Sequence, residues 1–311
     1  MIDKLEAFQE IKFGSGGEFC GAWLFMPDGA SESKPVPLVV MAHGLGGVKR
    51  VGLRPFAERF HAAGYACLVF DYRHFGDSSG EPREIVDFDK QLEDWRSAVG
   101  FARSLPGVDA DAIAVWGTSL GGGHVIETAA DDPRIAAAIA QCPFTDGRAT
   151  GAKIDLIALA KVMPRVALDL IAERTGTTPV RVATAGSKGQ AALMTTPDAM
   201  PGVEAMYTAI GEPYVSVNVG ARILPRIMKR APGRRAKDVS QPIFFAICEQ
   251  DSVTPADATI AWAETAPRAE IRRYETGHFD IYVSPWFDKV VADQVAFLQD
   301  HLPPASLSGN D

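Results

Sequence analysis

Ser119 lies at the centre of residues 117–121, Gly-Thr-Ser-Leu-Gly, whose types and spacing suit a nucleophile. This pentapeptide follows an apolar run, Ala112 to Trp116, and opens a helix-like segment, Leu120 to Ala130. The order predicts a strand, a sharp turn and a helix, with glycines two residues before and after the serine, where a Cβ would clash. Such a turn lifts the serine hydroxyl above the sheet edge and leaves the Leu120 N–H free to donate to an oxyanion. Because the pattern arises by chance in about one chain in ten of this length, it needs support elsewhere in the sequence.

Other polar groups follow apolar runs in the same way. In an open parallel sheet, ligands bind just beyond the C-terminal ends of the strands, so residues that follow several strands meet at one edge. One of these groups is the glycine-rich turn that begins at His43. The Leu45 N–H in this turn is another candidate oxyanion donor. The runs and their polar groups are Pro37 to Met41 with His43 and Leu45, Pro242 to Cys248 with Asp251, and Glu270 to Glu275 with His278.

The chain resembles the α/β-hydrolase superfamily over nearly its whole length, through His43-Gly44, residues 117–121, Asp251 and Gly277-His278, in the chain order Ser, Asp, His. Residues 71–82 and 277–282 are similar to a subgroup of dienelactone-hydrolase-like esterases and polyketide-transferase-like hydrolases. The resemblance implies a mostly parallel eight-stranded sheet with helices on both faces and a cap insertion. Dienelactone hydrolases carry a cysteine nucleophile where this chain has serine, so their ring-opening specificity is not carried over.

A serine hydroxyl needs a base to remove its proton as it attacks a carbonyl. His278 is the candidate base, and Asp251 would orient its imidazole and stabilise the imidazolium. Glu249 is a rival acid, but residues 251–255 resemble the family's acid turn, which favours Asp251. The implied reaction is attack by Ser119, an acyl-enzyme, and deacylation by water or another alcohol. Activity is expected to fall as the pH drops through about 6.5, because the base must be neutral.

Two classes of function remain open. The first is a serine carboxylic-ester hydrolase acting on a small-molecule ester, with acyl transfer, thioester cleavage and peptide cleavage as variants of the same site. The second is a non-catalytic protein that binds a small apolar ligand under the cap. The enzyme is favoured because a receptor has no need of all three of Ser119, Asp251 and His278.

Composition limits the other possibilities. The 311 residues and 47% hydrophobic content suit one α/β domain with an insertion. No leader pattern and no run of 18 apolar residues occurs, so the expectation is a cytoplasmic protein that does not enter a membrane. Its four cysteines lie in separate apolar runs, so we expect them to be buried, reduced thiols. Dinucleotide, phosphate-loop and His-Glu-x-x-His motifs are absent from the sequence, so neither a cofactor nor a metal is expected.

The net charge of −8 is unevenly distributed. Residues 148–237 hold 14 Lys and Arg against 6 Asp and Glu, so the remainder of the chain is strongly acidic. An acidic body argues against nucleic-acid binding, which requires a basic face. The basic segment attracts an anionic substrate, or it is a solvated or inter-subunit face that complements the acidic body. A homodimer formed through a sheet edge or the cap is therefore possible.

The alternation of strands and helices predicts a core from residues 1–145 and 239–302, a cap from 146–238 and a frayed tail from 303–311. Trp95, on the apolar stripe of a crossover helix, is expected in the core. The predicted strands are 8–13, 18–26, 37–42, 65–72, 112–116, 135–142, 242–249 and 270–275, and the predicted core helices are 53–63, 86–105, 120–130, 255–265 and 286–301.

The cap is expected to contain a helix over Ile154 to Ile171 that is interrupted at Pro164, a small hairpin within 179–196, and a helix near 203–210. Its methionines and tyrosines offer a flexible apolar surface for an acyl or alkyl group, although they also suit the cap's own small core. The candidate substrate-binding residues are Met163, Met206, Tyr207 and Tyr214.

Overall fold

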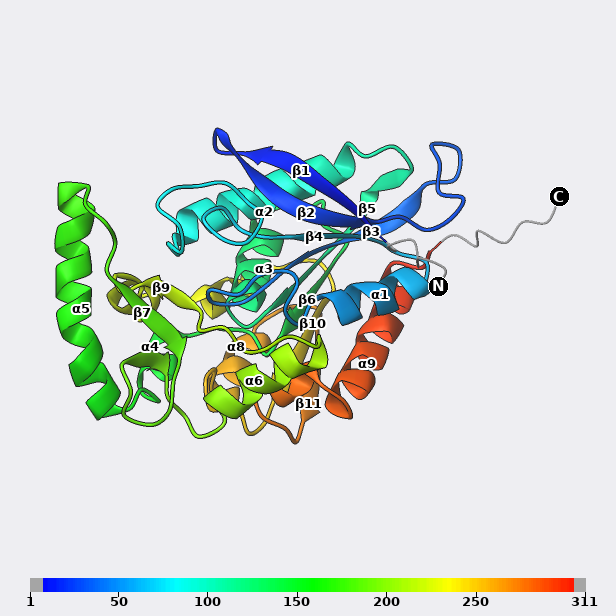
Figure 1. Ribbon diagram of the computed structural model, residues 1–311. Helices are drawn as coiled ribbons and strands as arrows, with labels where there is room; N and C mark the ends of the chain where they lie inside the picture. The colour runs from blue at the N-terminus through cyan, green and yellow to red at the C-terminus, as the bar shows by residue number, and fades with distance from the viewer. Residues whose placement is uncertain (1–7, 305–311) are drawn as a thin grey trace.

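The computed structural model describes residues 8–304, and Figure 1 shows a twisted sheet flanked by helices with a second group of elements beside it. The sheet has eight strands in the order β1-β2-β4-β3-β5-β6-β10-β11. β1 and β2 pair antiparallel, as do β2 and β4, and the remaining pairs are parallel. The strands are β1 (Gln9–Ser15), β2 (Glu18–Phe25), β3 (Val36–Ala42), β4 (Ala66–Phe70), β5 (Val108–Thr118), β6 (Ala137–Gln141), β10 (Ile243–Cys248) and β11 (Ala269–Tyr274). The predicted mostly parallel eight-stranded sheet is confirmed.

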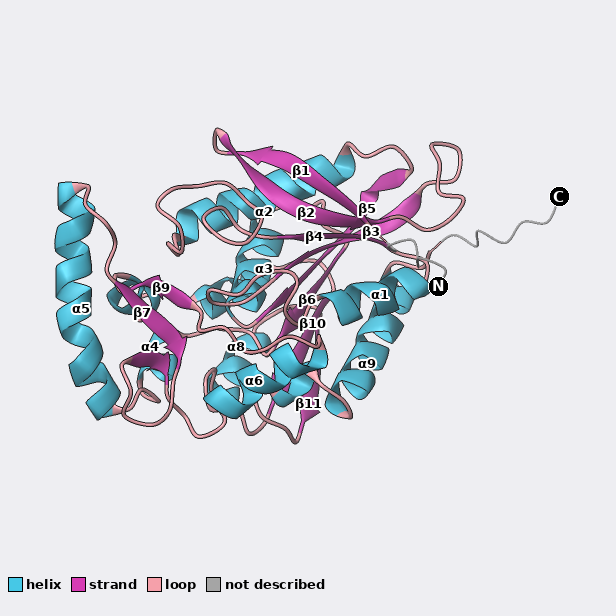
Figure 2. Cartoon of the chain, viewed as in Figure 1, coloured by secondary structure: helices cyan, strands magenta, loops and turns pink. Residues whose placement is uncertain are grey.

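Helices cover both faces of the sheet, as predicted. α1 and α9 pack on one face around Phe56 and Val290, while α2, α3 and α8 pack on the other around Trp95 and Val125. β3 is buried at every position, which explains its continuous apolar sequence. Figure 2 shows these layers. The helices are α1 (Arg54–Ala62), α2 (Phe88–Arg103), α3 (Leu120–Asp131), α8 (Ala256–Ala263) and α9 (Trp286–His301), with a short 3₁₀ turn, η2 (Asp280–Tyr282), before α9.

Trp95 on α2 is fully buried, and its Nε1 donates a hydrogen bond to the Tyr72 hydroxyl at 2.9 Å, so the expected core position is confirmed. All four cysteines are buried and unpaired by disulfides. Within the described residues, no helix combines the length and hydrophobicity needed to cross a membrane. Residues 305–311 of the predicted frayed tail lie outside the described part of the chain.

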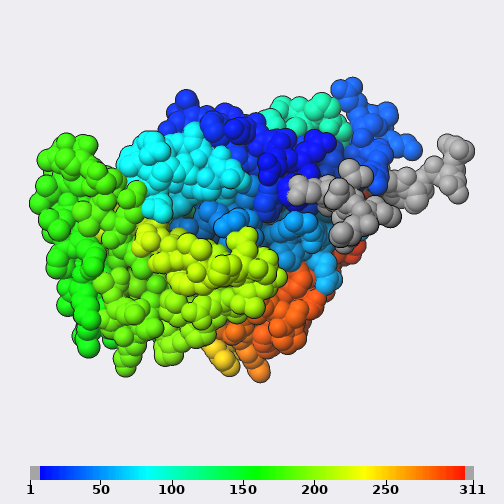
Figure 3. Space-filling view, in the orientation of Figure 1, coloured from blue at the N-terminus to red at the C-terminus, as the bar shows by residue number. Residues whose placement is uncertain are grey.

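The segment between β6 and β10, which we call the insertion (residues 146–238), carries its own three-stranded sheet in the order β8-β7-β9. In Figure 3 the insertion, coloured green to yellow-green, forms the left side and much of the lower front of the visible face. Its elements are α4 (Gly147–Gly151), α5 (Leu156–Thr175), β7 (Arg181–Ala185), β8 (Ala192–Met194), α6 (Ala199–Ala209), β9 (Asn218–Gly220), α7 (Ile223–Ile227) and η1 (Pro232–Asp238).

Two predictions within the insertion are wrong. α5 continues through Pro164 without interruption. Pro164 has no N–H to donate to the Ala160 carbonyl four residues earlier. Both residues are exposed, so water can satisfy that carbonyl. The predicted hairpin is absent because β7 and β8 pair in parallel, with Ala183 opposite Ala192.

A buried ion pair joins α5 to the chain around β9 and α7. The Asp169 carboxylate accepts hydrogen bonds from Arg222 Nε and Nη2, each at 2.8 Å, and from the Arg222 and Val180 amides, also at 2.8 Å. Burial opposes ionisation of Asp169, but these donors outweigh it and lower the pKa of the carboxyl below its ordinary value. The pair therefore fixes the outer helix of the insertion to its small sheet.

Candidate active site

Ser119 occupies a strained turn between β5 and α3, as the pentapeptide predicts. Its backbone has φ 55° and ψ −120°, a conformation that side chains other than glycine rarely adopt. A Cβ on Gly117 would lie 2.3 Å from the Gly121 carbonyl oxygen, and one on Gly121 would lie 2.5 Å from the His43 carbonyl oxygen. The turn is held by the Ser119 N–H, which donates to the Gln141 carbonyl at 2.9 Å. Both flanking glycines are thus required by close backbone approach.

Three side chains from three strand ends form a hydrogen-bonded chain. Ser119 follows β5, Asp251 follows β10 and His278 follows β11. His278 Nε2 lies 3.1 Å from Ser119 Oγ, and His278 Nδ1 lies 2.7 Å from Asp251 Oδ2. Asp251 and His278 are both buried. The structure brings together the three residues that the sequence singles out.

Further hydrogen bonds fix the Asp251 carboxylate. Oδ1 accepts from the Val253 and Thr254 amides at 2.8 and 2.6 Å, and Oδ2 accepts from Thr254 Oγ1 at 2.8 Å. An ionised carboxylate only accepts, so His278 Nδ1 is the donor to it. In a neutral imidazole, Nε2 is then the acceptor for the serine hydroxyl. The rival acid, Glu249, points elsewhere and pairs with Arg273 Nη2 at 2.7 Å.

Burial alone would lower the pKa of His278, because it disfavours the charged imidazolium. The adjacent Asp251 carboxylate outweighs burial and raises the pKa from 6.5 to about 9. The sequence expectation of a midpoint near 6.5 used the unperturbed value and did not include this buried partner. In this structure the neutral form of His278 becomes abundant only at higher pH.

The two candidate oxyanion donors, the Leu45 and Leu120 amides, flank Ser119. Leu120 begins α3, where amides have no carbonyl partner in the preceding turn. Within residues 8–304 neither amide donates a hydrogen bond to another protein group. A Cβ on Gly44 would lie 2.9 Å from Ser119 Cβ, which shows how closely the glycine-rich turn approaches the serine. Both amides are available to an added ligand atom.

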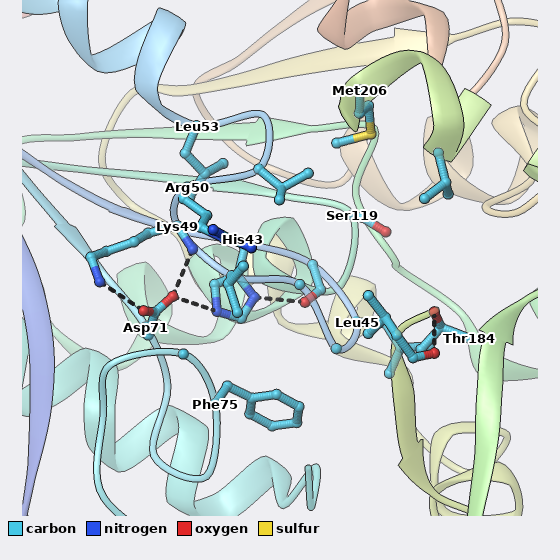
Figure 4. A pocket seen from close by; sticks show the side chains of 18 of the residues that line it. His43, Leu45, Lys49, Arg50, Leu53, Asp71, Phe75, Ser119, Thr184 and Met206 are labelled. Atoms are coloured by element: carbon cyan, nitrogen blue, oxygen red, sulfur yellow. Dashed lines mark hydrogen bonds and ion pairs between the residues drawn. The ribbon is translucent and has the colours of Figure 1, made fainter. Parts of the chain in front are cut away.

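His43 braces the glycine-rich turn from behind. Its Nδ1 donates to the Gly44 carbonyl at 2.9 Å, and its Nε2 lies 3.7 Å from Asp71 Oδ1. Burial lowers the pKa of His43 and keeps the ring neutral. Asp71 also accepts from Lys49 Nζ at 2.8 Å, and Figure 4 shows this linked group beside the cavity. The Lys49–Asp71 pair was not predicted from the sequence. Asp71 directly follows the strand β4, and this position could have indicated a role near the site.

A cavity of about 740 Å³ opens above Ser119 and His278. Loops of the eight-stranded core form one wall, and the insertion forms the other with Thr184, Met194 and residues 215–218 among its lining. Figure 4 shows Met206 on α6 projecting toward the cavity on the same side as Ser119. Tyr282 also lines the cavity and hydrogen-bonds to Thr118, a contact that no sequence pattern predicts.

The four candidate substrate-binding residues divide by position. Met206 and Tyr207 line the large cavity. Tyr214 does not line it but packs edge-on against Tyr207, with ring centroids 5.5 Å apart. Met163 is a correction: its side chain is 49% exposed on the outer face of α5, because the inward positions of that helix are Ala158, Val162, Val166, Asp169 and Ala172. Among the described residues, no cluster of three His, Cys, Asp or Glu side chains could hold a metal ion.

The chain has relatives in bacteria and fungi. The quorum-quenching protein AidA of Acinetobacter baumannii is 44% identical over 294 residues, 94% of this chain and 95% of that protein. Thiohydrolase aneE of Aspergillus aculeatus is 29% identical over 290 residues, 86% of each chain. A polyketide transferase, grgF of a Penicillium species, is 37% identical over 124 residues, which is 40% of each chain, so the predicted subgroup resemblance is confirmed.

The crystal structure of the α/β-hydrolase GrgF from Penicillium sp. sh18 matches with a TM-score of 0.77 at 23% identity, covering 95% of this chain and 99% of that one. That likeness confirms the fold. A family model described as serine aminopeptidase, S33, matches residues 33–282. The chain belongs to this hydrolase family, which has the α/β-hydrolase fold.

Proposed function

We propose that this protein is a serine hydrolase that cleaves carboxylic esters through an acyl-enzyme on Ser119. The observation that carries the proposal is the hydrogen-bonded chain from Ser119 through His278 to Asp251, with distances of 3.1 and 2.7 Å, at the floor of a large cavity. This is the arrangement that nucleophile, base and orienting acid require. The strained turn of Ser119 adds support, because such strain persists where it serves a site.

In the proposed reaction, Ser119 Oγ attacks the ester carbonyl carbon while its proton passes to His278 Nε2. The carbonyl π electrons move to oxygen, where the Leu45 and Leu120 amides stabilise the negative charge. The intermediate then collapses, the bond to the leaving alcohol breaks, and that oxygen takes the proton from Nε2. Water repeats the sequence in the second half, giving up its proton to His278, and releases the acid and free Ser119.

The insertion acts in this proposal as a cap over the site. Its Met206 and Tyr207 line the cavity, with Tyr214 behind them, so the insertion contributes a wall that the core alone would lack. Closing a site in this way excludes water and positions the substrate. The cap assignment is tested by replacing Met206 with alanine, which is expected to change the preference for the leaving group.

The second candidate function is thioester cleavage or acyl transfer at the same site. Relatives named thiohydrolase and polyketide transferase favour it, because thioester cleavage and acyl transfer can both proceed through an acyl group on a nucleophilic serine. The name of the A. baumannii relative, a quorum-quenching protein, adds bacterial signal molecules with ester or lactone groups to the substrates worth testing. A small-molecule acyl compound is the substrate in every version of this proposal.

The test compares hydrolysis of p-nitrophenyl esters, acyl thioesters and N-acyl homoserine lactones by the purified protein, its Ser119→Ala variant and a matched Ser104→Ala control. Ser104 is exposed at the end of α2, before β5, whose other end leads to Ser119, and it lines neither cavity, so its loss is expected to leave activity unchanged. Ser119→Ala is expected to reduce kcat by at least about 10⁴-fold while thermal unfolding stays the same.

Undiminished turnover by Ser119→Ala would overturn the proposal. A fluorophosphonate probe supplies a second reading, since it labels an activated serine even when the chosen substrate is poor. If the probe labels neither Ser119 nor any other residue and no substrate turns over, the non-catalytic binding function is favoured instead.

A further inference from the structure

A second, smaller cavity also reaches Ser119. Its volume is about 60 Å³, against about 740 Å³ for the large one. Leu45, Ser119 and Met194 line both cavities, so the two spaces meet at the nucleophile. The small cavity lies between α3, the loop after β6 and the insertion, and its apolar lining includes Leu120, Phe144, Ile154, Leu193, Leu224 and Ile227.

Two polar groups in the small cavity are bound to protein partners, whereas the buried Thr150 hydroxyl has no hydrogen-bond partner among the described residues. Ser252 Oγ donates to the Asp198 carboxylate at 2.7 Å, and Thr254 Oγ1 donates to Asp251 Oδ2 at 2.8 Å. Among its described lining residues, the one charged side chain, Lys153, belongs to an exposed residue. Because most of its lining is apolar, this cavity suits an apolar ligand group.

The large cavity has a mixed character, because Trp23, Phe75 and Met206 line it beside charged groups. Its lining includes the charged side chains of Lys49, Arg50, Asp71, Arg83 and Glu84. Several of these charged groups are paired within the protein, Lys49 with Asp71 and Arg50 with Glu212. The two cavities thus differ mainly in size, and the large one offers both apolar and charged surface.

The path of one proton assigns the two halves of the substrate. In the reaction proposed above, the departing oxygen or sulfur takes its proton from His278 Nε2, so it must lie beside that atom. His278 lines the large cavity and is not among the described lining residues of the small one. The acyl group stays bonded to Ser119 Oγ after its bond to the departing oxygen or sulfur breaks. It must therefore occupy the small cavity.

We infer that this protein acts on short acyl groups, of about two to four carbons, attached to a larger alcohol or thiol. The inference rests on the proposed function and names its substrate class. The size follows from the volume, because an apolar cavity of about 150 Å³ holds benzene, with six carbons, and 60 Å³ is well under half of that. Met206 and Tyr207, which the sequence suggested as the acyl pocket, instead contact the leaving group.

The experiment measures kcat/KM for p-nitrophenyl acetate, butanoate, hexanoate and octanoate. The wild-type protein is expected to prefer acetate or butanoate. Its kcat/KM for octanoate should be at least about 100-fold lower, because each methylene that does not fit in the cavity lowers kcat/KM by a factor of about ten or more. Leu193→Ala enlarges the small cavity and is expected to move the optimum to hexanoate or longer. Met206→Ala, in the large cavity only, is the matched control and is expected to leave the acyl optimum in place.

Ile227→Trp supplies the test in the other direction and keeps it decisive should Leu193→Ala fail to fold. Ile227 lies on the short helix α7 and is only partly buried, so a larger side chain can be accommodated there while its ring fills the cavity. This variant is expected to retain acetate hydrolysis and lose butanoate hydrolysis by at least about tenfold.

The outcomes separate this inference from the function on which it rests. Ser119-dependent turnover with a long-chain optimum in the wild type, or an optimum that moves with Met206→Ala and not with the small-cavity variants, overturns the assignment of the acyl group and leaves the hydrolase proposal standing. No Ser119-dependent turnover and no phosphonate labelling overturns both.

Discussion

Replacement of Asp251 by asparagine tests the central geometry most directly. The side chain keeps its shape, and its oxygen can still accept from the Val253 and Thr254 amides that hold this turn. What it loses is the negative charge 2.7 Å from His278 Nδ1. An asparagine that keeps its oxygen toward the two amides presents its NH₂ group to the imidazole, so His278 no longer donates there and adopts the wrong tautomer.

The structure gives the size of the electrostatic part. Against burial, the Asp251 carboxylate is the main group that raises the pKa of His278 from 6.5 to about 9. At about 1.36 kcal/mol for each pKa unit, this is a preference of about 3 kcal/mol for the imidazolium, the form present in the transition state. Loss of that preference corresponds to a rate reduction of about 10²-fold, and the wrong tautomer extends it toward 10⁴-fold.

The assay is kcat on the preferred ester as a function of pH, with Glu249→Gln as the matched control. Glu249 precedes Asp251 by two residues but pairs with Arg273 at 2.7 Å, so its loss is expected to change kcat by less than about twofold. In Asp251→Asn the midpoint is also expected to fall, because burial then opposes the imidazolium without its main charge partner. Retention of activity within tenfold by Asp251→Asn would refute the reasoning, and so would a large loss in Glu249→Gln.

Three more outcomes follow from the structure. In the wild-type protein, kcat/KM is expected to rise with pH through neutrality toward about 9, since His278 must lose its proton to act as base; a plateau already reached at pH 6.5 contradicts the assigned pKa. Asp169→Asn is expected to lower the free energy of unfolding by about 3–5 kcal/mol in urea, because it leaves the buried Arg222 guanidinium with only the partly exposed Glu173 as a charge partner, whereas Asp111→Asn, 86% exposed in its pair with Arg134, should cost under about 1 kcal/mol. The wild-type pair stabilises above about pH 4 and loses that effect as the pH falls through the lowered pKa of Asp169, so equal acid sensitivity in wild type and Asp169→Asn would argue against it. Gly121→Ala is expected to abolish activity and destabilise the fold, since its Cβ would lie 2.5 Å from a carbonyl oxygen, while Gly100→Ala, with no neighbour within 4 Å in a helix, should stabilise by about 0.5–1 kcal/mol; similar melting temperatures for the two variants would contradict the clash.

The core and the three site residues could be predicted because their sequence signals are local and stereochemical. The turn at Ser119 demands glycines at fixed positions, and parallel strands bring the residues after them to one edge. Asp251 and His278 are far apart from Ser119 in sequence, but each follows the end of a predicted strand. Strand ends brought the candidates together, and the resemblance to the family's acid turn selected Asp251 over Glu249.

The insertion was harder to predict because its structure depends on contacts between distant segments. The parallel pairing of β7 with β8 leaves β7 free to pair antiparallel with β9, and no short-range pattern distinguishes this from a hairpin. α5 tolerates Pro164 because this residue lies on the exposed face of the helix, where water can satisfy the carbonyl that loses its donor. The raised pKa of His278 likewise follows from a buried neighbour 27 residues away, which composition does not reveal. The proposed cap, the possible homodimer and the cytoplasmic location stay predictions.

The separation of the two sheets has a consequence for how such a protein can diversify. Ser119, Asp251 and His278 all follow strands of the eight-stranded sheet, whereas Met194 and Met206 belong to the insertion, whose three strands pair only with one another in the described part of the chain. Mutations that reshape the walls around the substrate therefore need not disturb the strand ends that hold the reacting atoms. Selection can alter what is recognised while the chemistry is inherited unchanged.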